Sequence, residues 1–272
     1  ALFLGILLAR RIGLNSRIVG SAEMPGMDGG NPRRLILKLF IATSSFEFIV
    51  ATFVACRLWL GYGYDLPDAI WYGIFHAVSA FNNAGFALYS DSLMGFAADG
   101  WMLMPLNFAV IIGGLGFPVL FELGRRIIGR VKASQIGGVI ESALHWTLST
   151  RLVLWSTLVL LTFGTLYFAF IEWNNPATIG DMGFGEKLLN SFTQSVQPRT
   201  AGFNSVDLGQ VYPATLMGMD LLMFIGGGSA STAGGIKLTT TAVLIFIVWT
   251  EIRGETAVNV GSRRLPRSIQ RQ

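Results

Sequence analysis

Charged side chains are scarce in this sequence: Asp, Glu, Lys and Arg make up only 13% of its 272 residues, whereas hydrophobic residues make up 52%. About a quarter of the residues are charged in a typical soluble domain, so this composition excludes an ordinary water-soluble fold. A helix needs about 20 mainly apolar residues to cross a bilayer. Such stretches occur at 35–60, 102–121 and 149–171, with an interrupted one at 211–250. We therefore expect an all-α, polytopic membrane protein.

Cysteine and histidine are also rare, with one Cys56 and two histidines, His76 and His145. A single cysteine excludes an intrachain disulfide and a cysteine metal cluster. The histidines are too far apart for the His-Glu-x-x-His motif of zinc proteases, and the sequence before Asp220 lacks the Gly-x-Gly-Asp of aspartyl membrane proteases. We expect no enzyme, although an intramembrane enzyme and a non-conducting membrane scaffold stay open as alternatives.

Basic residues are grouped in the stretches 10–38, 125–132 and 253–271, and carboxylates lie mainly between these stretches. Short basic loops face the cytoplasm, so this pattern predicts a multi-pass protein of the cytoplasmic membrane. The formal net charge of +4 is explained by this topology, and we expect no nucleic-acid partner. The apolar opening before Arg10 resembles the end of an earlier spanning helix, which indicates a piece of a longer protein.

One motif occurs twice, as FHAVSAFNNAGF at 75–86 and FTQSVQPRTAGF at 192–203. In each copy a spanning stretch and a short helical segment, 68–81 or 184–197, precede an Ala-Gly-Phe turn, and a second spanning stretch follows. A single such triplet could equally be a helix C-cap, but the duplication favours two helix–pore-loop–helix units. Glycine suits a filter because exposed consecutive carbonyls require backbone angles that a Cβ obstructs.

The filter residues predicted from this repeat are Asn83, Ala84, Gly85, Phe86, Thr200, Ala201, Gly202 and Phe203. Gly85 and Gly202 are their central residues, and Asn82, Asn83 and Thr200 are expected to support the turns by hydrogen bonding. The short helices would place the negative ends of their dipoles near a cation.

The last apolar stretch is interrupted at mid-depth by ten small residues. They are Gly226, Gly227, Gly228, Ser229, Ala230, Ser231, Thr232, Ala233, Gly234 and Gly235. Irregular backbone is tolerated at that depth only inside the protein or along a water-filled cavity. We predict a gating loop on the cytoplasmic side of the filter; a helix-packing motif is the alternative, whereas a phosphate-binding loop would need Gly-Lys-Ser/Thr.

With filters reading NNAGF and QPRTAGFN and a loop reading MFIGGGSASTAGGIK, the sequence resembles the Ktr/Trk/HKT potassium transporters, particularly the Ktr-type membrane subunit. The resemblance implies four helix–pore-loop–helix repeats around a pseudo-fourfold pore, with K⁺ bound by the filter carbonyls. Glycine at both filters favours K⁺, and a role for Na⁺ stays open. No cofactor is implied, whereas a homodimer and a cytoplasmic nucleotide-binding regulatory subunit are.

On this resemblance, the segment 35–121 is repeat two and 149–250 is repeat three. The remaining segments are the end of an earlier helix with a cytoplasmic connection at 1–34, a cytoplasmic connection at 122–148 and a basic cytoplasmic segment at 251–272.

Three charged residues in apolar surroundings draw separate predictions. Asp220 is expected to attract cations, to pair with Lys237 or to serve as a structural anchor. Glu47 has no evident partner, and we assign it no function. Arg199 is expected to be structural, hydrogen-bonding carbonyls or pairing with Asp207.

Overall fold

The computed structural model describes residues 32–136, 146–253, 259–260 and 263–264. The helices in these ranges are α3 (Pro32–Tyr62), α4 (Leu66–Phe81), η1 (Met94–Phe96), α5 (Gly100–Leu115), α6 (Phe117–Ile136), α7 (Leu148–Glu172), α8 (Phe184–Val196), α9 (Pro213–Phe224) and α10 (Leu238–Ile252). Strands β1 (Asn259–Val260) and β2 (Arg263–Arg264) form a short antiparallel hairpin. The predicted helical class is confirmed; the predictions for residues 1–9 and His145 fall outside the described residues.

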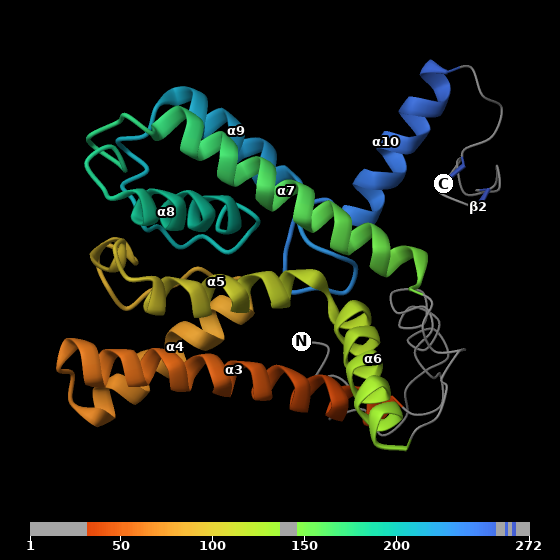
Figure 1. Ribbon diagram of the computed structural model, residues 1–272, viewed down its shortest axis with the longest axis horizontal. Helices are drawn as coiled ribbons and strands as arrows, with labels where there is room; N and C mark the ends of the chain where they lie inside the picture. The colour runs from red at the N-terminus through yellow and green to blue at the C-terminus, as the bar shows by residue number, and fades with distance from the viewer. Residues whose placement is uncertain (1–31, 137–145, 254–258, 261–262, 265–272) are drawn as a thin grey trace.

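Two long apolar helices match predicted spans. Ile36–Tyr62 of α3 and Leu148–Glu172 of α7 are long and apolar enough to cross a membrane. The interrupted stretch is confirmed as two shorter apolar helices, α9 and α10, on either side of a break. All four helices contribute to an elongated bundle (Figure 1).

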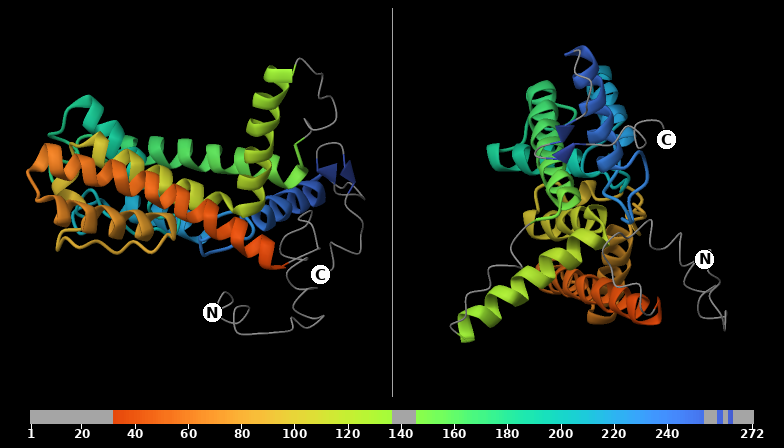
Figure 2. Two further views of the ribbon diagram at one scale, coloured as in Figure 1. Left: turned by 90° about the horizontal axis from the view of Figure 1, so that it is seen from below. Right: turned by 90° about the vertical axis from the view of Figure 1, so that its right-hand side faces the viewer.

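The stretch 102–121 is not the single straight span that its composition predicts. The chain bends by 105° between α5 and α6. Gly116, between the two helices, has a φ of 91°, which is left-handed backbone that favours glycine. Pro118 then lies in the first turn of α6, where its missing amide is tolerated. As a result, α6 projects from the axis shared by the longer helices (Figure 2).

A buried carboxylate holds this projecting helix against the start of α7. Glu122 of α6 accepts hydrogen bonds from the amide and hydroxyl of Thr147, at 3.0 and 2.8 Å, and from the Thr150 hydroxyl at 2.6 Å. Arg126 on the next turn also contacts it at 3.3 Å. These contacts fix the direction in which the chain leaves the α5–α6 bend.

The short helices α4 and α8 confirm the predicted segments 68–81 and 184–197. Both begin at the end of the bundle that holds the connections 63–65, 90–99 and 173–183, and both end midway along it (Figure 1). Gly73 lets α4 approach α3 closely, because a Cβ there would lie 2.7 Å from the Ala51 carbonyl oxygen. The ends of α4 and α8 therefore both lie in the interior of the bundle.

The two repeats share one core. Its buried residues around α3, α4 and α5 include Val54, Leu58, Ala77, Phe81, Met102 and Leu106, together with Val196, Ala201 and Phe203 from the second repeat. The segments after the two turns are also bonded: the Asn204 amide donates to the Ser92 hydroxyl at 3.0 Å, and the Leu93 amide donates to the Asn204 carbonyl at 2.9 Å. Packing thus fixes the second turn against the first repeat.

Candidate ion pathway

The two Ala-Gly-Phe turns have the same backbone pattern. Asn83 and Gly85 have φ values of 51° and 70°, and the aligned residues Thr200 and Gly202 have values of 74° and 96°. In each turn the alanine between these two residues stays outside the left-handed region. Left-handed backbone is uncommon for residues other than glycine and points to constraint by the surroundings. The repeat seen in the sequence is therefore also a repeat of backbone conformation.

The filter glycines lie next to each other. A Cβ on Gly85 would overlap the carbonyl oxygen of Ala201, while a Cβ on Gly202 would lie 3.7 Å from the Gly85 Cα. Gly85 is thus required both by its backbone conformation and by the space available, whereas Gly202 is required by conformation alone. The Ala201 carbonyl faces the opposite filter turn.

Backbone amides of the second turn are bonded on one side. The amides of Ala201 and Gly202 both donate to the carbonyl oxygen of Gln197, at 3.0 and 3.1 Å. The peptide bonds of the described residues are trans, so each carbonyl points away from the amide of the same peptide unit. The carbonyls of Thr200 and Ala201 are therefore turned away from α8, which is the orientation that a carbonyl-lined pathway needs.

The first turn is held by α4. The Ala84 amide donates to the Ser79 carbonyl, and the Ser79 hydroxyl donates to the Phe86 carbonyl, both at 2.8 Å. His76, which the sequence suggested only as an unlikely metal ligand, accepts the Leu88 amide at Nε2 (3.3 Å) while its Nδ1 lies 2.7 Å from the Tyr72 carbonyl. These anchoring roles could not be predicted from the sequence, in which the only signal was the position of both side chains on the pore helix.

An aromatic cluster packs behind this turn. His76 stacks on the Tyr89 ring with centroids 5.1 Å apart, and Phe203 of the second turn lies 6.5 Å from the same imidazole. The cluster supports the turn by packing.

The three predicted supporting residues behave differently. Asn82 donates to the Glu47 carboxylate at 2.8 Å, so the expectation that Glu47 lacks a partner is wrong. With its amide nitrogen facing inward, Asn83 donates to the carbonyls of Ala80 and Val110 at 3.2 and 3.3 Å. Thr200 instead accepts a hydrogen bond from the Gly234 amide at 3.0 Å, which connects the second turn to the loop 226–235.

Hydrogen bonds join the two ends of the loop 226–235 to each other. The amide of Gly226 donates to the Ile236 carbonyl at 3.0 Å, and the Ile236 amide donates to the Phe224 carbonyl at 3.1 Å. The Leu238 amide adds a bond to the Gly227 carbonyl at 2.9 Å, and the Lys237 ammonium donates to the Ala233 carbonyl at 2.7 Å. The loop is therefore a defined structure between α9 and α10.

This loop is bonded to the α5–α6 bend, backbone to backbone. The Gly228 amide donates to the Gly114 carbonyl at 2.8 Å, and the Thr232 amide donates to the Gly113 carbonyl at 3.2 Å. In return, the Phe117 amide donates to the Ala230 carbonyl at 3.2 Å. The sequence predicted one broken helix, whereas the structure pairs two breaks whose exposed backbone groups satisfy each other.

The loop also contacts the end of the first pore helix and the second filter turn. The Thr232 hydroxyl donates to the carbonyl of Phe81, the last residue of α4, at 2.9 Å. Thr200, in the second turn, accepts the Gly234 amide as described above. The predicted filter and gating-loop residues are thus brought together at one place, between the ends of the pore helices and the α5–α6 bend.

Two predicted ion pairs are wrong. Asp220 is exposed on α9, and Lys237 bonds the Ala233 carbonyl instead. Arg199 is only 6% exposed and lines a small cavity with Asn83, Gly227 and Ala233, whereas Asp207 is exposed and accepts the Gly209 amide. Among the described residues, Nε and Nη1 of Arg199 have no hydrogen-bond partner.

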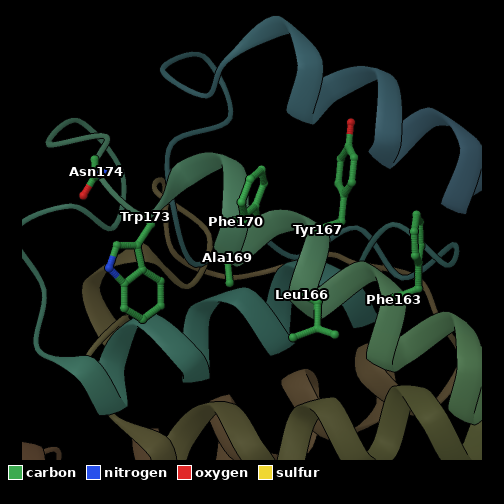
Figure 3. A pocket seen from close by; sticks show the side chains of 7 residues that line it. All are labelled: Phe163, Leu166, Tyr167, Ala169, Phe170, Trp173 and Asn174. Atoms are coloured by element: carbon green, nitrogen blue, oxygen red, sulfur yellow. The ribbon is translucent and has the colours of Figure 1, made fainter.

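A larger groove lies away from this site, along the outer half of α7 (Figure 3). It has a volume of about 680 Å³ and is lined by Phe163, Leu166, Tyr167, Ala169, Phe170, Trp173 and Asn174. None of these residues belongs to the filter turns or the loop. Its mainly apolar lining is consistent with a surface that meets lipid, so the groove is not part of the pathway.

Comparison with known proteins identifies the family of this chain. The family model of TrkH, described as cation transport protein, matches residues 6–272. The chain belongs to the TrkH family. This is a transporter family, which places the chain among transport proteins rather than enzymes.

Relatives of this TrkH-family chain are known by sequence and by structure. Ktr system potassium uptake protein B of Bacillus subtilis is 38% identical over 94% of this chain and 54% of its own length. Potassium/sodium uptake protein NtpJ of Enterococcus hirae is 34% identical over 85% of this chain and 48% of its own length. The crystal structure of the potassium transporter TrkH from Vibrio parahaemolyticus has a TM-score of 0.63 at 19% identity, covering 93% of this chain and 50% of that one. The chain spans about half the length of these relatives.

We predict that Gly85→Ala in the parent protein reduces discrimination of K⁺ from Na⁺ more than Gly202→Ala. Left-handed backbone with a Cβ costs about 1–2 kcal/mol, which corresponds to roughly 5- to 30-fold in selectivity at either site, and Gly85→Ala adds the overlap with Ala201. Competing K⁺ and Na⁺ uptake into vesicles measures the ratio. Gly185→Ala on α8, where a Cβ meets no atom within 4 Å, is the control. Unchanged ratios for both filter variants would refute the assignment.

Proposed function

We propose that the parent protein carries potassium ions across the cytoplasmic membrane, as a multi-pass protein, through a pathway that includes both filter turns. The supporting observation is the orientation of the second turn, in which bonded amides on one side leave the Thr200 and Ala201 carbonyls on the other, beside Gly85. Rows of carbonyls replace the hydration shell of K⁺ in filters of this kind. The ion ligands proposed are backbone carbonyls within Asn83–Phe86 and Thr200–Phe203.

The choice of potassium follows from the relatives, which are named for potassium uptake, one of them for potassium and sodium. Glycine at both turns fits this choice, because it allows several carbonyls to approach one desolvated cation. Sodium is therefore the competing ion against which selectivity must be measured. Further filter segments of the parent protein would complete the pathway.

We further propose that the loop 226–235 is the gate. Its support is the set of bonds that joins it to the α5–α6 bend, to the end of α4 and to the second filter turn. In this position the loop obstructs passage from the filter toward the end of the bundle where α6 projects. Release of these hydrogen bonds would let it move aside.

A homodimer and a cytoplasmic nucleotide-binding regulatory subunit are proposed as partners of the parent protein, in line with the resemblance of its motifs to Ktr-type subunits. The projecting helix α6 offers a surface for such a partner. Its large apolar side chains Ile127 and Ile128 are 63% and 57% exposed, beside the exposed Arg125. The mass of the purified parent protein, measured by light scattering with the detergent subtracted, should equal two copies. A mass of one copy would contradict the dimer.

Potassium uptake is tested first in a bacterium that lacks its own uptake systems and is given the intact parent gene. We expect growth at low potassium with the wild type and none with Gly202→Asp, because a carboxylate side chain would displace the coordinating carbonyls. Protein levels in the membrane are measured for both. Failure of a well-expressed wild type, with its regulatory partner supplied, would overturn the proposed function.

The gate is tested with Thr232→Val, which keeps the shape of the side chain and removes its hydrogen bond to the Phe81 carbonyl. We expect a higher rate of potassium flux, by roughly tenfold if one buried hydrogen bond of about 1.4 kcal/mol holds the loop in place. Ser231→Ala is the matched control, because the buried Ser231 hydroxyl has no hydrogen-bond partner in the part of the chain that the structure describes. Equal flux from the two variants and the wild type, in vesicles with equal amounts of protein, would count against the gate.

A further inference from the structure

A chain of buried amides lies behind the second filter turn. The Phe203 amide donates to Oε1 of Gln197 at 3.2 Å, and Nε2 of Gln197 donates to Oδ1 of Asn107 at 2.8 Å. Nδ2 of Asn107 then donates to the Thr193 hydroxyl, also at 2.8 Å. The three side chains are at most 2% exposed, so each bond replaces one that water cannot supply.

The direction of this chain is fixed from its far end. The Thr193 hydroxyl uses its proton to donate to the Leu189 carbonyl at 2.9 Å, so toward Asn107 it can only accept. Asn107 must therefore present its nitrogen to Thr193 and its oxygen to Gln197. Gln197 in turn presents its nitrogen to Asn107, which leaves its oxygen for the Phe203 amide. Asn107 thus sets which atom of Gln197 faces the filter.

Gln197 receives three successive amides of the turn. Those of Ala201 and Gly202 bond its backbone oxygen, and that of Phe203 bonds its side chain. Because the carbonyl of a trans peptide points opposite to its amide, the third bond turns the Gly202 carbonyl away from Gln197, as the first two turn the carbonyls before it. One residue therefore orients three consecutive carbonyls toward the same side.

The first turn has no equivalent of this chain. Aligning the filter glycines places Ala80 on Gln197 and His76 on Thr193. The first turn is held instead by the Ser79 hydroxyl on the Phe86 carbonyl, whereas Gln197 binds the amide of the aligned Phe203. Asn107, moreover, belongs to α5 of the first repeat, so the second filter is oriented by a side chain from its neighbour.

We propose that Gln197 and Asn107 are specificity-determining positioning residues: they hold the Gly202 carbonyl toward the ion pathway and thereby set the discrimination of K⁺ from Na⁺. The inference rests on the proposed function, since it concerns the same filter. Neither side chain is an ion ligand, because both act from behind the turn. Without them the Gly202–Phe203 peptide is free to rotate, and the spacing of the carbonyls is no longer fixed.

The experiment uses the full-length parent protein in vesicles, with competing K⁺ and Na⁺ uptake as the readout. Gln197→Met keeps the length of the side chain and removes both polar atoms, and Asn107→Leu removes the group that orients Gln197. We expect each variant to lower the K⁺/Na⁺ uptake ratio by about tenfold, the effect of one hydrogen bond. The double variant should be no worse than Gln197→Met alone, because both act through one chain of bonds.

Asn190→Leu is the matched control. Asn190 is a fully buried amide on the same helix α8 and bonds the Ala97 carbonyl of the first repeat at 2.8 Å. We expect this variant to lower the melting temperature in detergent while it keeps the wild-type uptake ratio. A purely structural role for Gln197 would instead give all three variants lower stability and the same ratio as the wild type.

The outcomes separate the two proposals. A wild type that moves no potassium refutes the proposed function, whereas a selective wild type with equally selective Gln197→Met and Asn107→Leu variants refutes only the positioning role. If Gln197→Met yields no folded protein, Asn107→Leu decides, because it leaves the Phe203 acceptor in place and removes only its orientation. A lowered ratio in a folded Asn107→Leu variant supports the inference.

Discussion

The structure depends on one constraint: a backbone amide in the interior of a membrane protein must find a partner within the protein. In the second filter turn three successive amides, those of Ala201, Gly202 and Phe203, find this partner on Gln197. Planar trans peptides then place the carbonyls on the opposite side. The short helices that end in the interior, and the buried polar groups behind them, hold this asymmetry in place. In the proposed filter, the orientation of the carbonyls that would bind a cation follows from where the amides are satisfied.

The same constraint explains the two helix breaks. The loop 226–235 and the α5–α6 bend each expose backbone groups that would be unpaired alone, and they bond each other instead. This requires backbones in close contact: a Cβ on Gly113 would overlap the Phe81 carbonyl, and one on Gly228 would overlap the Leu115 carbonyl. Glycine here allows backbone segments to approach each other closely and does not make the loop flexible, since reciprocal hydrogen bonds join the two ends of the loop. The proposed gate would move by exchanging backbone bonds.

Repetition of the motif does not make the two filters equivalent. The aligned phenylalanines show the difference: Phe203 is fully buried in the core of the first repeat, whereas Phe86 is 70% exposed. The two residues are also held by different backbone groups. Phe203 is bonded through its amide to Gln197, whereas Phe86 is bonded through its carbonyl to Ser79. Each turn is thus shaped by the elements packed against it, and the second is shaped largely by the first repeat. In the proposed filter, selectivity would therefore be a property of neighbouring repeats together.

Sequence by itself determined the two continuous spans, the pore helices, the pair of filter turns and the break at 226–235. These features follow from the length of the apolar stretches, from the repeated motif and from the positions of glycines, all of which can be read along the chain. The tertiary structure alone decided the bend at Gly116, the Asn82–Glu47 bond, the burial of Arg199 and the contact between Asn107 and Gln197. The physical reason is that each of these depends on groups brought together by packing, in the last case across 90 positions of the chain. The bend within 102–121, for example, could not be predicted, because a straight helix and a bent one can have the same apolar composition.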